Sequence, residues 1–285
     1  MRNLLKAGLR RLSGTAAPAE PRHLPGHRRA VVIAVATRKG GVGKTTTSVN
    51  LAAALARFHD KKVLLVDLDP QGHCTTALKA HLRPGGAPLS AVLLDEHGGE
   101  VLDCVAPTDI PNLFVTPFDA RLGQAEDQLA ARIGKELVLR DALRVTRTHF
   151  DVIVLDCPPN QGNLSVNGLV AADRLVVPCD PSPLAVKGVE ALLETVEQVA
   201  GRLNPELDVL GILLTRVDGR NTKMNDAVVN QLEQDWGGLV LPVRISTSTS
   251  LSKAQMVGTD VFAFEPDGRA AAQYRDLARI IAEQA

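Results

Sequence analysis

The chain has 285 residues, and its 32 Lys and Arg side chains balance its 32 Asp and Glu side chains. A content of 45% hydrophobic and 22% charged residues is typical of a globular protein and excludes a disordered chain. No apolar run reaches the roughly 18 residues that a membrane-spanning helix needs. The four cysteines have neither the spacing of a disulfide framework nor that of a zinc site, which indicates reduced thiols in a cytoplasmic protein.

Charge is unevenly distributed along the chain. Residues 1–29 hold seven basic side chains and one acidic one, a net charge of +6, so the remaining residues carry −6. We expect residues 1–29 to form a basic, disordered tail, with a short amphipathic helix at 1–13 or an organellar transit peptide as alternatives. Residues 30–285 are expected to form one α/β domain.

Apolar runs alternate with amphipathic segments from residue 30 onward. Continuous apolar runs bounded by turn residues predict strands that are buried on both faces. Strands that alternate with helices predict a mostly parallel sheet covered by helices on both faces. We expect strands at 30–36, 63–67, 113–116, 151–156, 174–178, 209–215 and 239–241, and helices at 46–58, 124–143 (in one or two pieces), 164–172, 184–203, 225–236, 250–256 and 269–282.

A glycine-rich segment, KGGVGKTT, follows the first predicted strand and spans residues 39–46. Glycines let backbone N–H groups turn toward phosphate oxygens, and the N-terminus of the next helix adds its dipole. Lys44 is expected to neutralise the β- and γ-phosphates, and the Thr45 hydroxyl to bind Mg²⁺. The standard P-loop pattern has a glycine where this chain has Arg38; a glycine turn without a ligand is the alternative. The predicted phosphate-binding residues are Gly40, Gly41, Val42, Gly43, Lys44, Thr45 and Thr46.

The first lysine of this loop has no role in a standard P-loop. With it, the segment resembles the KGGxGK[ST] loop of the ParA/MinD family of deviant Walker ATPases. The resemblance extends over residues 30–285 and implies a P-loop NTPase fold of the deviant Walker A type. It also implies that Lys39 reaches across an ATP-sandwich homodimer to the γ-phosphate bound by the partner, and that Lys39, Lys44 and Asp69 are catalytic.

Two acidic segments also resemble motifs of this family: VLLVDLDPQ at 63–71 and VIVLDCPP at 152–159. Carboxylates at the ends of parallel strands lie where phosphates and metals bind. The resemblance implies that Asp69 orients the attacking water and that Asp67 supports Mg²⁺ or the switch loop. It implies that Asp156 holds Mg²⁺ through water. Ordinary turn or helix-capping acids are the alternative.

A fourth element of the resemblance is LTRVD, at 214–218, where the family recognises adenine. Asp218 is the candidate for that contact, and turn formation by Asp218 and Gly219 is the alternative reading.

The resemblance implies a slow, partner-stimulated ATPase with ATP and Mg²⁺ as its ligands. Such a protein partitions or positions a cargo, either plasmid or chromosome DNA or a protein complex, through ATP-gated, non-specific DNA binding. It is expected on the nucleoid, with a ParB-like or cargo-adaptor protein as its stimulating partner. A local basic strip suffices for DNA binding. The candidates are Arg216, Arg220, Lys223, Arg244 and Lys253, of which Arg244 resembles a DNA-contact position of the family.

The alternative function is a MinD-like membrane-surface switch anchored by residues 1–13. That segment has four apolar residues on one face and a glycine, so its membrane binding would be weak. The chain ends ARIIAEQA, without the basic membrane helix of MinD. We therefore favour DNA over a membrane as the binding surface.

Overall fold

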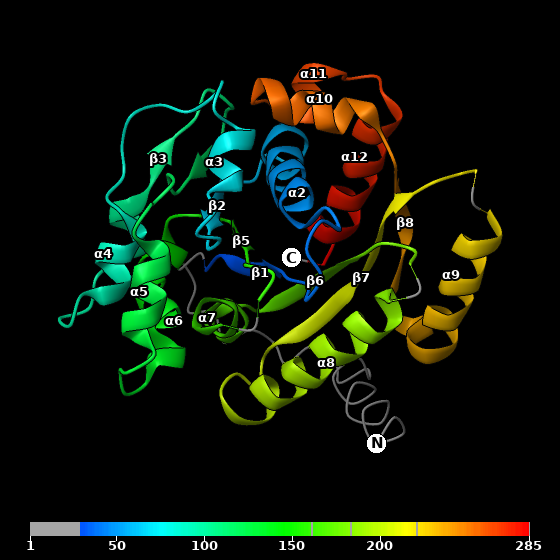
Figure 1. Ribbon diagram of the computed structural model, residues 1–285. Coiled ribbons are helices and arrows are strands. Elements are labelled where there is room, and N and C mark those ends of the chain that lie inside the picture. Colours follow the sequence, from blue (N-terminus) through cyan, green and yellow to red (C-terminus); the bar gives the residue numbers. More distant parts are fainter. Residues whose placement is uncertain (1–28, 161, 183, 221, 285) are drawn as a thin grey trace.

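The computed structural model describes residues 29–160, 162–182, 184–220 and 222–284 (Figure 1). The predicted tail, with its candidate helix at 1–13, lies outside the described residues except for Arg29. The described strands are β1 (Val31–Val35), β2 (Val63–Asp67), β3 (Ala106–Pro107), β4 (Leu113–Val115), β5 (Val152–Asp156), β6 (Arg174–Cys179), β7 (Asp208–Val217) and β8 (Val240–Ser246).

These strands form one sheet in the order β3-β4-β2-β5-β1-β6-β7-β8. All neighbouring strands run parallel except β3 and β4, which are antiparallel. The mostly parallel sheet is confirmed. β1 lies in the middle because it pairs with β5 on one side and β6 on the other.

Helices cover both faces of the sheet (Figure 1). β1, β2, β5 and β6 are apolar on both faces because each face packs against a helical layer. Val32 and Ala34 belong to one apolar cluster, while Ile33 and Val35 belong to the other. The described helices are α2 (Lys44–Phe58), α3 (His73–Ala77), α4 (Leu89–Leu94), α5 (Leu122–Leu129), α6 (Val138–Ala142), α7 (Asn163–Ala171), α8 (Ala185–Arg202), α9 (Thr222–Trp236), α10 (Thr249–Val257), α11 (Val261–Phe264) and α12 (Arg269–Ala282).

The two layers are different sets of helices. α2, α3, α11 and α12 contribute to the cluster on one face, and α4 to α9 contribute to the cluster on the other. Figure 1 shows α2 and α12 on the upper side of the sheet and α5 to α8 on the lower side. The long amphipathic helices therefore lie where burial of an apolar stripe stabilises them.

The sequence prediction missed the short elements, and several predicted boundaries differ from those of the structure. α3, α4, α11 and β3 have between two and six residues, too few for a periodic pattern to be recognised. The predicted helix at 124–143, expected in one or two pieces, is two helices, α5 and α6. Gly134 lies between them and has a left-handed backbone conformation. β8 continues to Ser246, beyond the predicted end at residue 241, although its exposed Pro242 and Arg244 break the apolar run. β8 is an edge strand, where such residues are tolerated.

Candidate nucleotide-binding site

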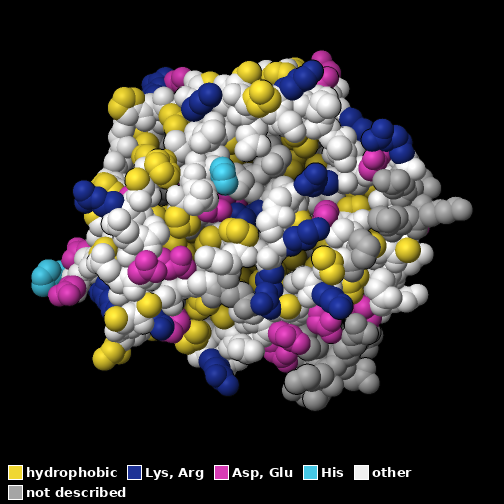
Figure 2. Space-filling model, in the orientation of Figure 1, with side chains coloured by type: hydrophobic (Ala, Val, Ile, Leu, Met, Phe, Trp, Pro, Cys, Tyr) yellow, Lys and Arg dark blue, Asp and Glu magenta, His cyan; other side chains and the backbone are white. Residues whose placement is uncertain are grey.

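The described part of the chain contains a cavity of about 570 Å³ at the carboxyl edge of the sheet. It is lined by the segments that follow β1, β2 and β5, by the last residues of β7 and β8, and by α10 and α12. Figure 2 shows this face hollowed near its centre, with Lys and Arg side chains around the hollow. Parallel α/β sheets bind ligands at this edge. The predicted phosphate-loop residues that line the cavity are Gly40, Gly41, Gly43, Lys44, Thr45 and Thr46, while the side chain of Val42 is buried.

The loop between β1 and α2 is bent at two glycines. Gly41 has a φ of 76° and Gly43 a φ of 86°, both in the left-handed region that side chains disfavour. Gly43 is the N-cap of α2 and has no side chain to cap the helix. The first N–H groups of α2 are therefore available to an anion, which fits the predicted phosphate loop.

Lys44 begins α2 and is buried between two carboxylates. Its Nζ lies 3.3 Å from Asp156 Oδ1 and 3.7 Å from Asp69 Oδ2. Burial lowers the pKa of Lys44, but the charges of Asp156 and Asp69 outweigh burial and leave that pKa raised. The ammonium group is thus charged, and a buried ammonium is a strong attractor for phosphate oxygens.

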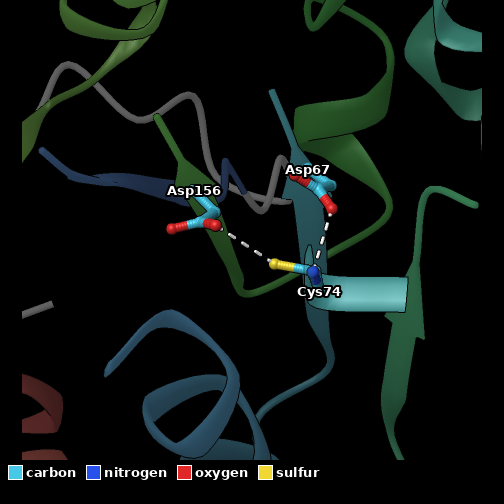
Figure 3. A group of neighbouring side chains, drawn as sticks. All are labelled: Asp67, Cys74 and Asp156. Atoms are coloured by element: carbon cyan, nitrogen blue, oxygen red, sulfur yellow. Dashed lines mark hydrogen bonds between the residues drawn. The ribbon is translucent and has the colours of Figure 1, made fainter. Parts of the chain in front are cut away.

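Asp156, at the end of β5, is the centre of a buried polar cluster. Thr45 Oγ1 donates to its Oδ2 at 2.7 Å, and Ser48 Oγ donates to its Oδ1 at 2.8 Å. The thiol of Cys74 donates to Oδ2 at 3.4 Å (Figure 3). Burial raises the pKa of Cys74 well above its usual value, so the thiol stays protonated and acts as a donor.

Asp67, at the end of β2, lies next to Asp156 because the two residues pair across β2 and β5. Its carboxylate accepts the N–H group of Asp69 at 3.0 Å and that of Cys74 at 3.0 Å. Figure 3 shows the bond from Cys74. Burial, reinforced by the charge of Asp156, raises the pKa of Asp67 to about 7. The candidate ligand atoms of Asp67, Cys74 and Asp156 lie within 4.8 Å of one another. Carboxylate oxygens suit Mg²⁺, while a protonated thiol does not.

The raised pKa of Asp67 predicts a pH-dependent stability. The folded protein holds this proton up to about pH 7, whereas the unfolded chain releases it near 3.8, so stability falls as the pH rises between these values. Asp67→Asn should remove that fall and stabilise the metal-free protein at pH 8 by about 1–3 kcal/mol. Urea unfolding of both proteins at pH 5 and pH 8 measures it. A variant no more stable than the wild type at pH 8 would contradict it.

Lys39, the other lysine of the loop, points to a third carboxylate. Its Nζ donates to Asp180 Oδ1 and Oδ2 at 3.0 and 2.8 Å and to Ser182 Oγ at 3.0 Å. Asp180 follows β6, the neighbour of β1 on the side opposite β5. The Lys39 side chain is 37% exposed, and it is held by its own chain at the rim of the cavity.

Of the other predicted site residues, some line the cavity and others lie outside its lining. Asp218 is not among its lining residues, and its carboxylate pairs with Arg220 at 3.0 Å, which lowers the pKa of Asp218. Arg216 lines the cavity, whereas Arg244 and Lys253 are exposed on β8 and α10. Lys223 lies in α9, and its side chain is outside the described part.

The sequence analysis did not predict the residues that line the side of the cavity away from the phosphate loop. They come from the end of β8, from α10 and from α12, and hydroxyl groups predominate among them. It also missed Asp180, whose contact with Lys39 depends on β6 lying beside β1. A serine- and threonine-rich run at 246–252 was the available signal. The lining residues in this half are Ile245, Ser246, Thr247, Ser248, Leu251, Ser252, Gln255 and Tyr274.

The doubly covered parallel sheet and the loop around a buried lysine define a P-loop nucleotide-binding protein. Residues 30–209 match the family described as "AAA domain". The chain is 38% identical to the sporulation initiation inhibitor protein Soj of Bacillus subtilis, over 88% of this chain and 98% of Soj. It is 36% identical to the chromosome partitioning protein ParA of Caulobacter vibrioides, over 87% and 92%.

A solved structure of cobyrinic acid a,c-diamide synthase from Mycobacterium smegmatis, with bound ADP and magnesium, is also similar. It has 35% sequence identity and a TM-score of 0.73, over 88% of this chain and 93% of that chain. The chain belongs to the ParA/MinD family of ATPases, as its phosphate loop predicted. Within the described residues, no helix is both long and apolar enough to cross a membrane.

Proposed function

We propose that the protein is an ATP-dependent, dimerising ATPase that partitions or positions a cargo through ATP-gated, non-specific binding to DNA. The observation that carries the proposal is the pair of loop lysines: Lys44 is buried on Asp156 and Asp69, and Lys39 stands at the rim. A lysine side chain at the rim is placed to break its contacts within its own subunit and to act on a second subunit. The Soj and ParA relatives support the partition role.

The cavity binds ATP with Mg²⁺ in this proposal. The glycine bends and the uncapped start of α2 fit phosphate groups, and the oxygens of Thr45, Asp156 and Asp67 fit the metal. Mg²⁺ would supply charge neutralisation at the phosphates. Lys44 and Thr45 both contact Asp156, so this carboxylate keeps the two ligand-binding groups in place.

Asp69 is the proposed residue that orients the water for attack on the γ-phosphate. Its side chain is 8% exposed and lines the cavity, and its Oδ1 accepts the N–H of Gln71 at 3.0 Å. That bond fixes the carboxylate, so one oxygen is positioned by the turn while the other faces Lys44. Positioning of this kind is the main contribution that a protein makes to phosphoryl transfer.

The DNA-binding surface is proposed to form in the dimer. Arg220, Arg244 and Lys253 are exposed, and the side chain of Arg220 is 88% exposed although it pairs with Asp218. Residues 30–285 carry a net charge of −6, so one subunit offers DNA only a local basic strip. Two such strips side by side would double the number of phosphate contacts. A ParB-like or cargo-adaptor protein is the proposed stimulating partner.

We expect DNA binding to require ATP and to weaken steeply with salt. If the dimer neutralises Z phosphates, log affinity should fall with log salt at a slope of about −0.9Z. Fluorescence anisotropy on labelled duplex DNA, with ATP or ADP at several salt concentrations, measures this. The double variant Arg244→Ala, Lys253→Ala should bind DNA less tightly than the wild type. Its log affinity should also fall less steeply with log salt. Equal DNA affinity with ATP and ADP, or binding to anionic vesicles but not to DNA, would contradict the proposal.

A further inference from the structure

Arg216 stands apart from the other basic residues of the predicted DNA strip. It lies near the end of β7 and lines the nucleotide cavity. Its φ is 53°, in the left-handed region that an arginine rarely adopts. The pairing of β7 with β8 is irregular at the same point, between Leu214 and Val217. Strained conformations of this kind persist where the surrounding structure holds them, and they concentrate at functional sites.

Arg216 and its neighbour hold two successive carbonyl groups of the phosphate loop. Arg216 Nη1 donates to the carbonyl of Gly41 at 2.5 Å, and Thr215 Oγ1 donates to the carbonyl of Val42 at 2.7 Å. In a trans peptide the C=O and the N–H of one unit point in opposite directions. The two bonds therefore turn the N–H groups of Val42 and Gly43 away from β7 and fix their orientation.

Arg216 also brings a charge that is not neutralised. Three residues with permanently positive side chains line the cavity: Lys39, Lys44 and Arg216. Lys39 pairs with Asp180, and Lys44 pairs with Asp156 and Asp69. Within the described ranges, Arg216 forms no ion pair, and its guanidinium uses one of its five N–H donors on Gly41. A polyphosphate would meet this charge without first displacing a carboxylate.

We propose that Arg216 is a nucleotide-positioning residue. Through Gly41 it holds the phosphate loop in its binding conformation, and its free charge favours a polyphosphate in the cavity. This inference rests on the proposed nucleotide site, and it assigns Arg216 to that site instead of the DNA surface. The phosphate loop and the end of β7 then act as one unit, because Thr215 and Arg216, which donate hydrogen bonds to the loop, also line the cavity.

The test is the affinity of the full-length chain for a fluorescent ADP analogue with Mg²⁺, measured by titration. Arg216→Ala should raise Kd about ten- to hundredfold, the loss expected for a charged hydrogen bond. Arg216→Gly should raise it equally, and it should fold at least as readily because glycine tolerates a φ of 53°. Arg216→Lys, which keeps a cationic donor, should recover most of the affinity. Arg202→Ala, at an exposed arginine of α8 outside the cavity lining, is the matched control and should bind like the wild type.

The outcomes separate this inference from the proposed function. If the wild type does not bind the nucleotide, the proposed function fails. If the wild type binds it and both Arg216→Ala and Arg216→Gly have a Kd within twofold of the wild type, the positioning role is overturned. If Arg216→Lys fails to restore affinity and all three variants melt at lower temperature without ligand, Arg216 only stabilises the fold, and the inference is equally overturned.

Discussion

Lys39→Ala is expected to leave the protein monomeric with ATP and to abolish its turnover. A charge supplied to the γ-phosphate from a second subunit is worth on the order of 10³–10⁵ in rate. In the isolated chain Lys39 is bound to Asp180 and Ser182, so its loss should leave the affinity for a single nucleotide nearly unchanged. Sizing chromatography with ATP, phosphate release and nucleotide titration measure the three properties separately.

The contact with Asp180 provides a matched variant for this prediction. Dimerisation through Lys39 would have to break the ion pair of 2.8 Å that holds the lysine on its own chain. Asp180→Ala should therefore release Lys39 and shift dimerisation to lower ATP concentrations, the opposite of Lys39→Ala. The pair is partly exposed, so we expect a modest shift. A Lys39→Ala protein that dimerises and hydrolyses ATP like the wild type would refute the role of Lys39 in the second subunit.

Asp69→Ala and Lys44→Ala are expected to fail at different steps. Without Asp69 the protein should bind ATP and dimerise, but hydrolysis should slow by about 10²–10⁴ because no carboxylate orients the water. The dimer bound to ATP should then accumulate. Asp69→Asn is the control: it can keep the acceptor for the Gln71 N–H but not the charge, so it should be equally slow. A variant with normal turnover would remove Asp69 from the chemical step.

Lys44→Ala should lose nucleotide binding itself. Removal of this ammonium also leaves the buried carboxylate of Asp156 beside Asp67 without its cation. Breaking a buried ion pair by removing one partner typically costs about 3–5 kcal/mol, so the variant should also be less stable. Thermal melting and nucleotide titration, with Lys44→Arg as a variant that keeps the charge, distinguish lost stability from lost affinity. Wild-type affinity in Lys44→Ala would contradict the phosphate contact.

Much of the fold could be predicted from the sequence because the long elements have strong local patterns. The apolar runs of β1, β2 and β5 needed no tertiary information, since only a sheet covered on both faces accommodates them. The glycine-rich loop was equally readable, because its glycines and lysines lie within eight consecutive residues. Short elements such as α3 and β3 carried no comparable signal.

Most of the site, by contrast, depends on strand order. Asp67 and Asp156 are distant in sequence and adjacent in space because β2 pairs with β5. Burial in the sheet, reinforced by this neighbouring charge, raises the pKa of Asp67. Lys39 meets Asp180 because β6 lies beside β1. No local pattern encodes these neighbours.

The sequence by itself determined the class of the protein and its phosphate loop, because local spacing specifies a glycine bend and a helix start. Only the tertiary structure decided what each charge contacts. It placed Arg216 over the loop and Asp218 on Arg220, outside the cavity lining. The physical reason is that a charged side chain acts on its neighbours within a few ångströms, and the packing of the sheet selects those neighbours.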